Sequence, residues 1–295
     1  MIPEYPKFKN LEIADFEIVT KYLNASPRSI CELNLANLFI YRNFDRAQLT
    51  MINENLCLLI SPMHEAPYFL EPLSQHKLSS TIETCLNLTG KLSRLSKRFC
   101  ESLSKDEYRC KYLRNQSDYI YLREDLANLE GKKFDGKRNH LKRFLKHFPD
   151  YQFVPLKAEH AVQALKLFEE WAGHKKETRF FTKFSYNSQK KAIEEAFGQF
   201  DKLNCKGGML FAEDSVKGFI LGTANPNMIS VHFSYGKPQT AGVFQMLIKE
   251  ACEKTFNSFK YINLEQDLGI PGLRKAKLSW HPKKLEEKFE IKPLH

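Results

Sequence analysis

The sequence has no long apolar run and no export signal, and each absence excludes a class of protein. Its longest apolar run, residues 56–60, is five residues long, whereas a membrane-spanning helix needs about 20. The segment from Met1 to Lys7 lacks the basic start and apolar centre of a signal peptide. We therefore expect a cytoplasmic protein without a transmembrane segment.

Cysteine and histidine are also not arranged in any metal or disulfide pattern. The seven cysteines are odd in number and include no CxxC pair, which argues against a disulfide framework and a zinc ribbon. The histidines show no HxH or HExxH spacing, and no Walker or GxSxG motif occurs. We expect reduced thiols and no metal, and we disfavour a nucleotide hydrolase or a serine hydrolase.

The chain is nevertheless rich enough in apolar residues to fold. Hydrophobic residues make up 42% of its 295 positions, and a chain of this length favours two domains. The net charge of +10 is concentrated, because residues 91–147 carry 16 basic against 8 acidic side chains and residues 270–295 carry 7 against 3. This distribution favours an anionic partner such as RNA or a nucleotide; a solvated basic helix face is the alternative.

Periodicity predicts a mixed α/β chain. In the first half it indicates a helix at 15–23, a hairpin at 49–60, a strand at 68–70, a helix at 78–99 and a strand at 118–122. An amphipathic basic helix at 131–148 is followed by helices at 161–171 and 188–203. The next residues predict an antiparallel meander of strands at 208–213, 216–224 and 228–235, then a helix at 241–256 and a strand at 261–264. The intervening loop, residues 236–242, is placed to bind an anion at a helix N-terminus.

Two long motifs resemble a known family. The first comprises DYIY (118–121), EDL (124–126), LEGKK (129–133) and KRNH (137–140), and the second reads NLEQDLGIPGLRKAKLSWHP over 263–282. Together with residues 68–72 and 168–171 they make the chain similar to the phosphatidylglycerol lysyltransferase C-terminal domain family. The resemblance implies an α/β fold of two tandem GNAT-like (acyl-CoA N-acyltransferase-like) domains, each a mostly antiparallel sheet flanked by helices. We expect one domain at 1–130 and a second, carrying the active site, at 131–295.

The same resemblance implies a transferase related to the Fem-type aminoacyltransferases. The expected donor is aminoacyl-tRNA, the expected acceptor is an amine or hydroxyl of a small molecule or a lipid headgroup, and no tightly bound cofactor is expected. An acyl-CoA-dependent N-acyltransferase is one alternative, although loop 236–242 departs from the usual acyl-CoA pattern of an Arg or Gln followed by spaced glycines. A non-catalytic RNA-binding module on the same fold is another.

Three groups of residues are candidates for the site. Those expected to bind the donor and its phosphates are Lys137, Arg138, His140, Lys237, Gly242, Arg274, Lys275 and Lys277. Those expected at the reacting groups are Asn263, Glu265 and Asp267, whose alternation along a strand end predicts one shared face, with His232 and Tyr235 as proton carriers. Tyr119, Tyr121 and Trp171 are candidates for a substrate pocket. Each group has a structural alternative, namely an exposed helix face, a salt-bridge cluster and core packing, respectively.

Overall fold

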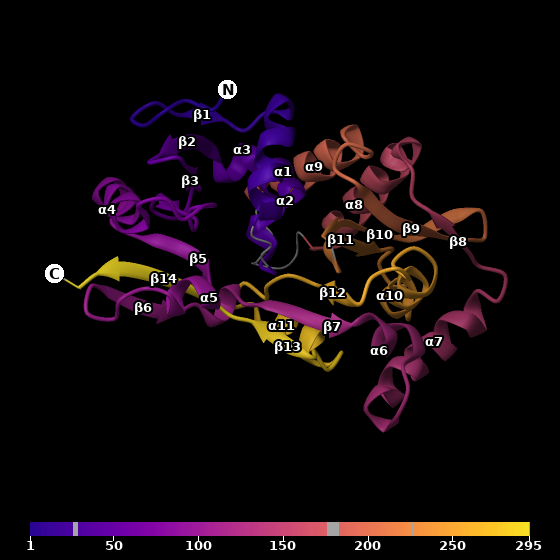
Figure 1. Cartoon of the computed structure of the whole chain (residues 1–295). Coiled ribbons are helices and arrows are strands. Elements are labelled where there is room, and N and C mark those ends of the chain that lie inside the picture. The colour runs from indigo at the N-terminus through magenta and orange to yellow at the C-terminus, as the bar shows by residue number, and fades with distance from the viewer. Residues whose placement is uncertain (26–28, 176–182, 226, 295) are drawn as a thin grey trace. The chain divides into compact units, whose positions relative to one another are not determined.

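A computed structural model describes residues 1–25, 29–175, 183–225 and 227–294, and it shows a mixed α/β chain (Figure 1). The helices are α1 (Phe16–Ala25), α2 (Leu35–Ile40), α3 (Arg42–Asp45), α4 (Leu78–Thr89), α5 (Lys97–Glu101), α6 (Arg123–Asn128), α7 (Asp135–His147), α8 (Ala161–Lys175), α9 (Lys183–Gly198), α10 (Val243–Lys254) and α11 (Pro271–Leu278). The strands are β1 (Lys9–Asn10), β2 (Gln48–Ile52), β3 (Asn55–Ile60), β4 (Tyr68–Phe69), β5 (Leu92–Ser96), β6 (Tyr108–Tyr112), β7 (Asp118–Leu122), β8 (Gln152–Pro155), β9 (Cys205–Ala212), β10 (Ser215–Asn225), β11 (Met228–Gly236), β12 (Tyr261–Asn263), β13 (Lys284–Glu286) and β14 (Lys288–Pro293).

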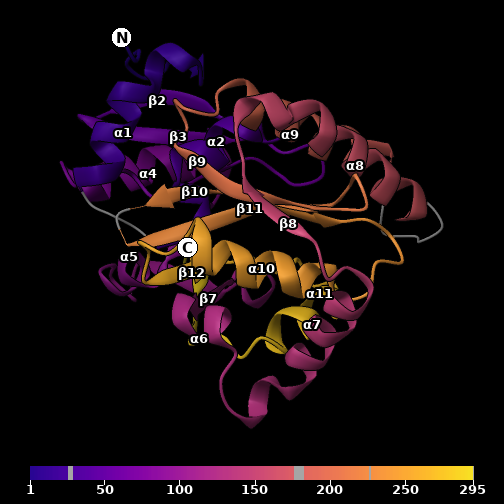
Figure 2. The same ribbon diagram turned by 90° about the vertical axis from the view of Figure 1, so that its right-hand side faces the viewer.

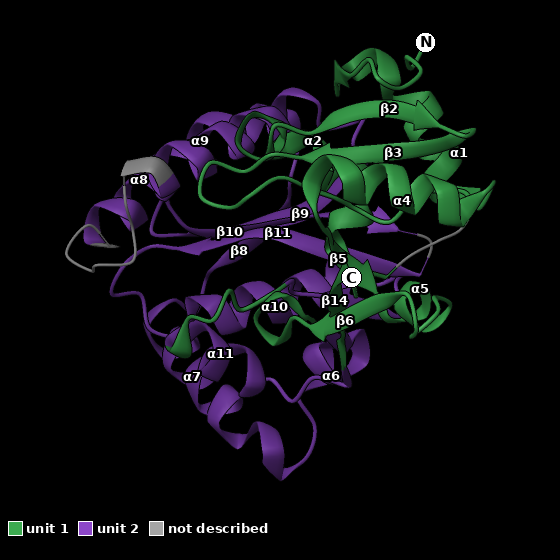
Figure 3. Cartoon of the chain, turned by 90° about the vertical axis from the view of Figure 1, so that its left-hand side faces the viewer, with its two compact units in different colours: residues 1–118, 266–271, 285–295 green, residues 119–265, 272–284 purple. Residues whose placement is uncertain are grey.

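The chain divides into two compact units that are interleaved in sequence (Figure 3). Unit 1 comprises residues 1–118, 266–271 and 285–295, and unit 2 comprises residues 119–265 and 272–284. The first boundary therefore lies at Asp118, before the expected position near residue 130. The reason is β7, whose residues Tyr121 and Ile120 pair with Ile262 and Asn263 of β12 and so belong to the second sheet.

Unit 1 contains a sheet with the strand order β1-β2-β3-β4-β5-β14-β6. Its neighbouring strands are antiparallel except for β4 and β5. Helices α4 and α5 contribute Ile82, Leu86 and Phe99 to the apolar cluster that covers this sheet. The hairpin expected at 49–60 is confirmed, and Asn53 and Glu54 form its turn with positive φ angles.

The helix expected at 78–99 is only half right. It ends at Gly90, which has a φ of +71°, and glycine is the usual residue at such a left-handed helix end. Leu92 and Leu95 then belong to strand β5 and are fully buried. Apolar residues three apart fit a helix as well as a short buried strand, so spacing alone did not separate the two.

Unit 2 contains a sheet with the strand order β13-β7-β12-β11-β10-β9-β8. The expected meander β9-β10-β11 is confirmed, and β12 pairs with β11 in parallel. Helices α8 and α9 lie over one face of this sheet and α10 lies over the other (Figure 2). The strand order places the parallel pair β11 and β12 near the centre of the sheet.

The expected basic helix is α7. Leu141 and Phe144 are buried, whereas Lys142, Arg143 and Lys146 are exposed, so the helix is amphipathic as its spacing predicted. It ends one residue before Phe148, which precedes Pro149. Across all helices in the described ranges, none is long and apolar enough to span a bilayer.

Candidate functional site

A row of polar side chains crosses the centre of the unit 2 sheet. Thr223 of β10 pairs with Ser230 of β11, and Ser230 pairs with Asn263 of β12. Residues paired across neighbouring strands point to the same face, so these three side chains share one face. All three are at most 2% exposed. Buried polar side chains in a row are unusual in a sheet core and mark a structural network or a site.

His232 joins this row through a β-bulge. Leu221 pairs with Phe233 and the next residue, Gly222, pairs with Val231, so His232 is the extra residue on β11. Bulges redirect side chains and are frequent beside active sites.

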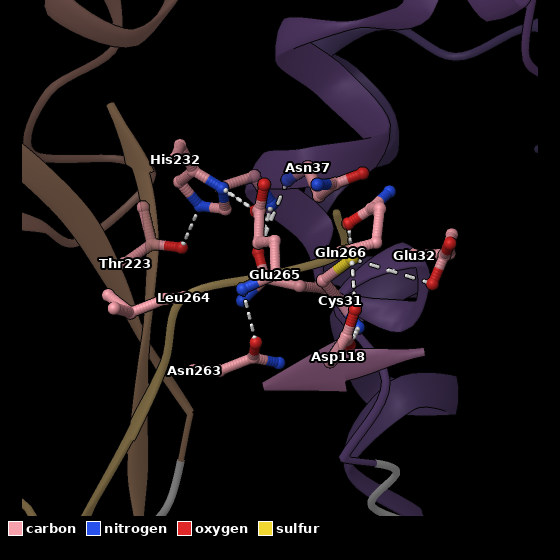
Figure 4. A network of polar contacts seen from close by, with 12 residues as sticks. Cys31, Glu32, Asn37, Asp118, Thr223, His232, Asn263, Leu264, Glu265 and Gln266 are labelled. Atoms are coloured by element: carbon pink, nitrogen blue, oxygen red, sulfur yellow. Dashed lines mark hydrogen bonds and ion pairs between the residues drawn. The ribbon is translucent and has the colours of Figure 1, made fainter. Parts of the chain in front are cut away.

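The redirected imidazole connects a hydroxyl to a carboxylate (Figure 4). Its Nε2 lies 2.7 Å from Oγ1 of Thr223, and its Nδ1 lies 2.8 Å from Oε1 of Glu265. The imidazole is fully buried, whereas the side chain of Glu265 is 16% exposed. The carboxylate is therefore the more exposed end of this chain of contacts.

The backbone of Glu265 is held in an unusual conformation where the chain leaves β12. Its φ angle is +57°, a region that non-glycine residues seldom occupy. The N–H of Glu265 donates to Oδ1 of Asn263 at 2.6 Å, and its carbonyl accepts from the N–H of Tyr119 at 3.2 Å. Nζ of Lys277 donates to the carbonyls of Leu264 and Glu265. A backbone conformation of this kind, held by several contacts, is one of the features that functional sites share.

We call Thr223, Ser230, His232, Asn263 and Glu265 the polar site of unit 2. The structure thus brings together three of the residues expected at the reacting groups, and Lys277 of the donor group supports them from α11. Sequence reasoning missed Thr223 and Ser230. No sequence signal distinguishes these two hydroxyls, because their proximity to His232 depends on strand register and on the bulge.

Asp267 does not belong to this site. Strand β12 ends at Asn263 and Glu265 has a positive φ angle, so the expected alternation of residues 263, 265 and 267 on one face is wrong. Asp267 lies in unit 1, where its fully buried carboxylate accepts from Arg114 at 3.1 Å and from the N–H of Gly269 at 2.8 Å.

The aromatic candidates lie on both faces of the sheet. Tyr235 pairs with Phe219 on the face of Thr223, and its ring lies 4.8 Å from that of Trp171. Its hydroxyl donates to Gln189 at 3.0 Å, and burial raises the pKa of Tyr235, so this hydroxyl stays protonated at neutral pH.

The other two aromatic candidates lie elsewhere. Tyr121 pairs with Ile262 and so points to the opposite face from Asn263, where its hydroxyl donates to the Lys277 carbonyl at 2.8 Å. Tyr119, two residues earlier on the same strand, is fully buried and lies beneath Nζ of Lys277, which is 5.8 Å from its ring centre. The three residues expected to form one substrate pocket are therefore not brought together.

The basic candidates of α7 have different surroundings. Nζ of Lys137 lies 4.2 Å above the Trp280 ring and donates to Oγ of Ser279 at 2.6 Å, and burial lowers the pKa of Lys137 to about 8. Arg138 donates to the carbonyls of Leu129 and Gly131 and pairs with Asp135. Arg138 therefore stabilises the start of α7. A phosphate could bind Arg138 only by displacing these contacts.

The remaining donor candidates are spread over unit 2. A Cβ on Gly242, whose φ is +79°, would lie 2.2 Å from the carbonyl oxygen of His140, so the backbone of α7 packs against the start of α10. The side chain of His140 is exposed and Lys237 lies in the turn after β11. Arg274 and Lys275 lie on α11, which begins at Pro271, a residue that is common at the first position of a helix.

Unit 1 contains a buried charge cluster that sequence reasoning missed. Ligand atoms of Cys31, Glu32 and Asp118 lie within 4.8 Å of one another, which is metal-like spacing. The ammonium of Lys288 lies 2.6 Å from Asp118 and 2.5 Å from Glu32. A lysine side chain of the protein therefore provides the positive charge next to these two carboxylates. Burial alone lowers the pKa of Lys288, but the neighbouring Asp118, Cys31 and Glu32 outweigh it and hold that pKa well above its ordinary value. The cluster fits a buried ion pair better than a metal centre.

Comparison with known proteins gives a consistent picture. The family model described as phosphatidylglycerol lysyltransferase, C-terminal, matches residues 24–292. A solved structure of a conserved protein of unknown function from Bacteroides thetaiotaomicron is 28% identical, with a TM-score of 0.86 and coverage of 99% of this chain and 100% of that one. No curated protein sequence matches the chain.

More distant structures show the fold alone. L-PGS from Bacillus licheniformis is 16% identical, with a TM-score of 0.63 and coverage of 99% of this chain and 93% of that one. FemX is 8% identical, with a TM-score of 0.57 and coverage of 96% of both chains. These likenesses and the two seven-stranded sheets confirm the expected fold class of two tandem GNAT-like α/β domains.

Proposed function

Because the chain belongs to the phosphatidylglycerol lysyltransferase C-terminal family, we propose that it is an aminoacyltransferase that takes its aminoacyl group from a charged tRNA. The acceptor is a hydroxyl or amine, and a phosphatidylglycerol headgroup is the first candidate, by analogy with the name of the family. The proposal places the reaction at the polar site of unit 2.

The observation that carries this proposal is the Glu265 carboxylate, fixed by His232 at the end of β12 and partly exposed. An aminoacyl ester is already activated, so the enzyme's main task is to align the ester with the acceptor. In the reaction the acceptor oxygen or nitrogen bonds to the ester carbonyl carbon and the bond from that carbon to the ribose oxygen breaks. The proton lost by the acceptor ends on the ribose oxygen. The transfer reaction as written needs no oxidant, reductant or metal.

The exposed side of α7 supports a tRNA donor. Lys142, Arg143 and Lys146 lie three and four residues apart, on one side of the helix, and are exposed. Within the described residues none of the three forms an ion pair. We call them the α7 basic stripe. Unpaired basic side chains in a stripe are suited to phosphate oxygens, and the stripe replaces Arg138 as the main phosphate contact in the proposal.

Acyl-CoA is the competing donor. It would use the loop 236–242 and the N-terminus of α10, where the backbone of His140 packs against Gly242. A carbonyl oxygen so close to Gly242 repels a phosphate bound beside it, which weakens the acyl-CoA alternative.

The test is a transfer assay with a labelled amino acid. Charged tRNA is incubated with the protein and with vesicles that contain phosphatidylglycerol, or with small hydroxyl and amine acceptors, and labelled product is measured. Parallel reactions contain labelled acetyl-CoA in place of charged tRNA. We expect product from charged tRNA. Product from acetyl-CoA alone would establish the acyl-CoA alternative, and tight tRNA binding without product for any acceptor would favour the RNA-binding module.

A further inference from the structure

The polar site of unit 2 has an arrangement that a purely structural network does not require. Oγ of Ser230 is fully buried and has no hydrogen-bond partner within the described residues. An unsatisfied buried hydroxyl costs about 1–3 kcal/mol, and networks that serve only stability satisfy their members. Ser230 stands between Thr223 and Asn263 in the row. The site therefore contains at least one hydrogen-bonding group, the Ser230 hydroxyl, that its own contacts do not satisfy.

The three residues linked by hydrogen bonds, Thr223, His232 and Glu265, also differ in exposure from one end of the chain of contacts to the other. The hydroxyl of Thr223 and the imidazole of His232 are buried, and the carboxylate of Glu265 is partly exposed. In a hydrolase triad the hydroxyl is the reacting end and the carboxylate is buried behind the imidazole. In this site the hydroxyl is the buried end and the carboxylate is the exposed end, the reverse of a hydrolase triad. The carboxylate is the most exposed group of the three, and the imidazole contacts it from the buried side.

A positioned carboxylate is suited to binding a cation. The imidazole fixes Oε1 of Glu265, and Asn263, Tyr119 and Lys277 fix its backbone. Such preorganisation lowers the entropy that binding would otherwise cost. An aminoacyl group differs from a simple acyl group in carrying an amino group that is protonated near neutral pH. A charge-assisted hydrogen bond from that ammonium to a carboxylate is about twice as strong as a neutral one.

We propose that Glu265 binds the primary ammonium group of the substrate, and that His232 and Thr223 are positioning residues for its carboxylate. This inference rests on the proposed function and deepens it, because it makes the amino group the feature by which an aminoacyl donor is distinguished from an acyl donor. The ammonium belongs to the donor amino acid or to an amine acceptor, and these two sources share the same chemistry at Glu265.

The test measures binding of small probes to the full chain. L-alaninamide carries an amino group beside a carbonyl, propionamide lacks the amino group, and propylamine lacks the carbonyl. We expect L-alaninamide to bind more tightly than propionamide, and Glu265→Gln to remove this preference by weakening L-alaninamide about tenfold or more. Preference for L-alaninamide over propylamine identifies the donor as the source of the ammonium, and the reverse preference identifies the acceptor.

Two further variants separate binding from folding. Glu195→Gln is the matched control, because the Glu195 side chain on α9 is 15% exposed and ion-paired, and we expect it to leave all probe affinities unchanged. Thr223→Val keeps the size of the side chain and removes the hydroxyl behind His232, so we expect a smaller loss of L-alaninamide affinity with propionamide unaffected. A structural role alone would alter all the probes together or none.

The outcomes distinguish this inference from the proposed function. If Glu265→Gln folds, as thermal unfolding shows, and still prefers L-alaninamide as the parent does, the assignment of Glu265 is wrong. Equal binding of L-alaninamide and propionamide by the parent also overturns it. If the preference depends on Glu265 but no amino acid is transferred from charged tRNA, the inference stands and the proposed function fails.

Discussion

Single side chains in this molecule are shifted from their ordinary chemistry by burial and by their neighbours. Lys137 has an ammonium over an indole ring and a hydroxyl as its hydrogen-bond partner. Neither carries a full negative charge, so burial dominates and lowers the pKa of Lys137 to about 8. This lysine therefore changes charge within a pH range where other lysines remain protonated.

We predict that Lys137 reacts with amine-selective reagents much faster than other lysines near pH 8. The unprotonated amine is the nucleophile, and at pH 8 about half of Lys137 is unprotonated, whereas a lysine with an ordinary pKa near 10.4 is unprotonated to less than about one part in a hundred. Brief acetylation followed by peptide mass spectrometry measures the rate at each lysine. Lys142 on the same helix is the exposed control. Equal rates at Lys137 and Lys142 across pH 7–9 would show that burial does not lower this pKa.

Lys288 shows the opposite effect, because its charge is compensated. Its ammonium is fully buried between Asp118 and Glu32. Removing one partner of a buried pair leaves an uncompensated charge. We predict that Lys288→Met lowers the free energy of unfolding by about 3–5 kcal/mol, measured by chemical denaturation. Lys292→Met on the same strand is the control, since Lys292 is exposed, and a similar loss in both variants would contradict the role of the pair.

The pH dependence of this effect follows from the sign of the shift. The pKa of Lys288 in the folded protein is raised above its unfolded value of 10.5. Its contribution is therefore fully present below pH 10.5 and is lost only as pH rises through the folded pKa. The difference between the parent and Lys288→Met should stay constant from pH 6 to pH 9.

At this scale the sequence indicated part of the site. Asn263 and Glu265 were expected from the motif and the strand end, and His232 from the last strand of the meander, and the structure brings the three side chains together. Thr223 and the cluster around Lys288 were not identified, since their partners lie 9 and 170 positions away in the chain and depend on register. Asp267 was misplaced because a left-handed turn at Glu265 is not visible in an alternating pattern.

At the scale of single elements, α7 combines two roles. Its apolar side packs into unit 2, and its basic stripe is exposed. The sequence predicted this helix and its charge correctly, because a helical period with interleaved basic residues has few other interpretations. Strand β5 was missed, because its five residues carry the same apolar spacing as the end of a helix.

We predict that replacing Lys142, Arg143 and Lys146 together with Ala weakens tRNA binding and flattens its salt dependence. Each lost phosphate contact reduces the slope of log affinity against log salt by about 0.7 to 0.9, so the triple variant should lose about 2 to 3 in slope. Filter binding over a range of salt concentrations measures this. The control replaces three exposed lysines of unit 1, Lys105, Lys111 and Lys292. If the control loses as much slope, the effect comes from net charge and the stripe has no specific role.

At the scale of the whole chain, each unit is assembled from segments that are separated in sequence. Strand β14 pairs with both β5 and β6, which precede it by more than 170 positions. Unit 2 takes most of its residues from the continuous segment 119–265. The likeness to a family predicted two tandem domains, but their interleaving was not predicted, because strand pairs so distant in the chain leave no local pattern.

We predict that ending the chain after Lys284 unfolds the centre of the unit 1 sheet and leaves the unit 2 meander protected. Without β14, strands β5 and β6 lose their common partner and Asp118 loses Lys288. Hydrogen exchange with mass spectrometry measures this, peptide by peptide. Peptides from β5 and β6 should exchange fast while those from β9, β10 and β11 remain slow. Unchanged protection of β5 and β6 would mean that β14 is dispensable.

The position of β14 also sets the order in which the chain can fold during translation. Tyr112 ends β6 and Lys288 begins β14, and at 5–20 residues per second the ribosome needs roughly 10 to 35 s to make the segment between them. During that time β5 and β6 present unpaired edges, which attract other chains. Segment 119–265 leaves the ribosome first and completes most of unit 2. We therefore expect slow codons placed between residues 112 and 285 to prolong this exposure and to increase aggregation of the newly made chain.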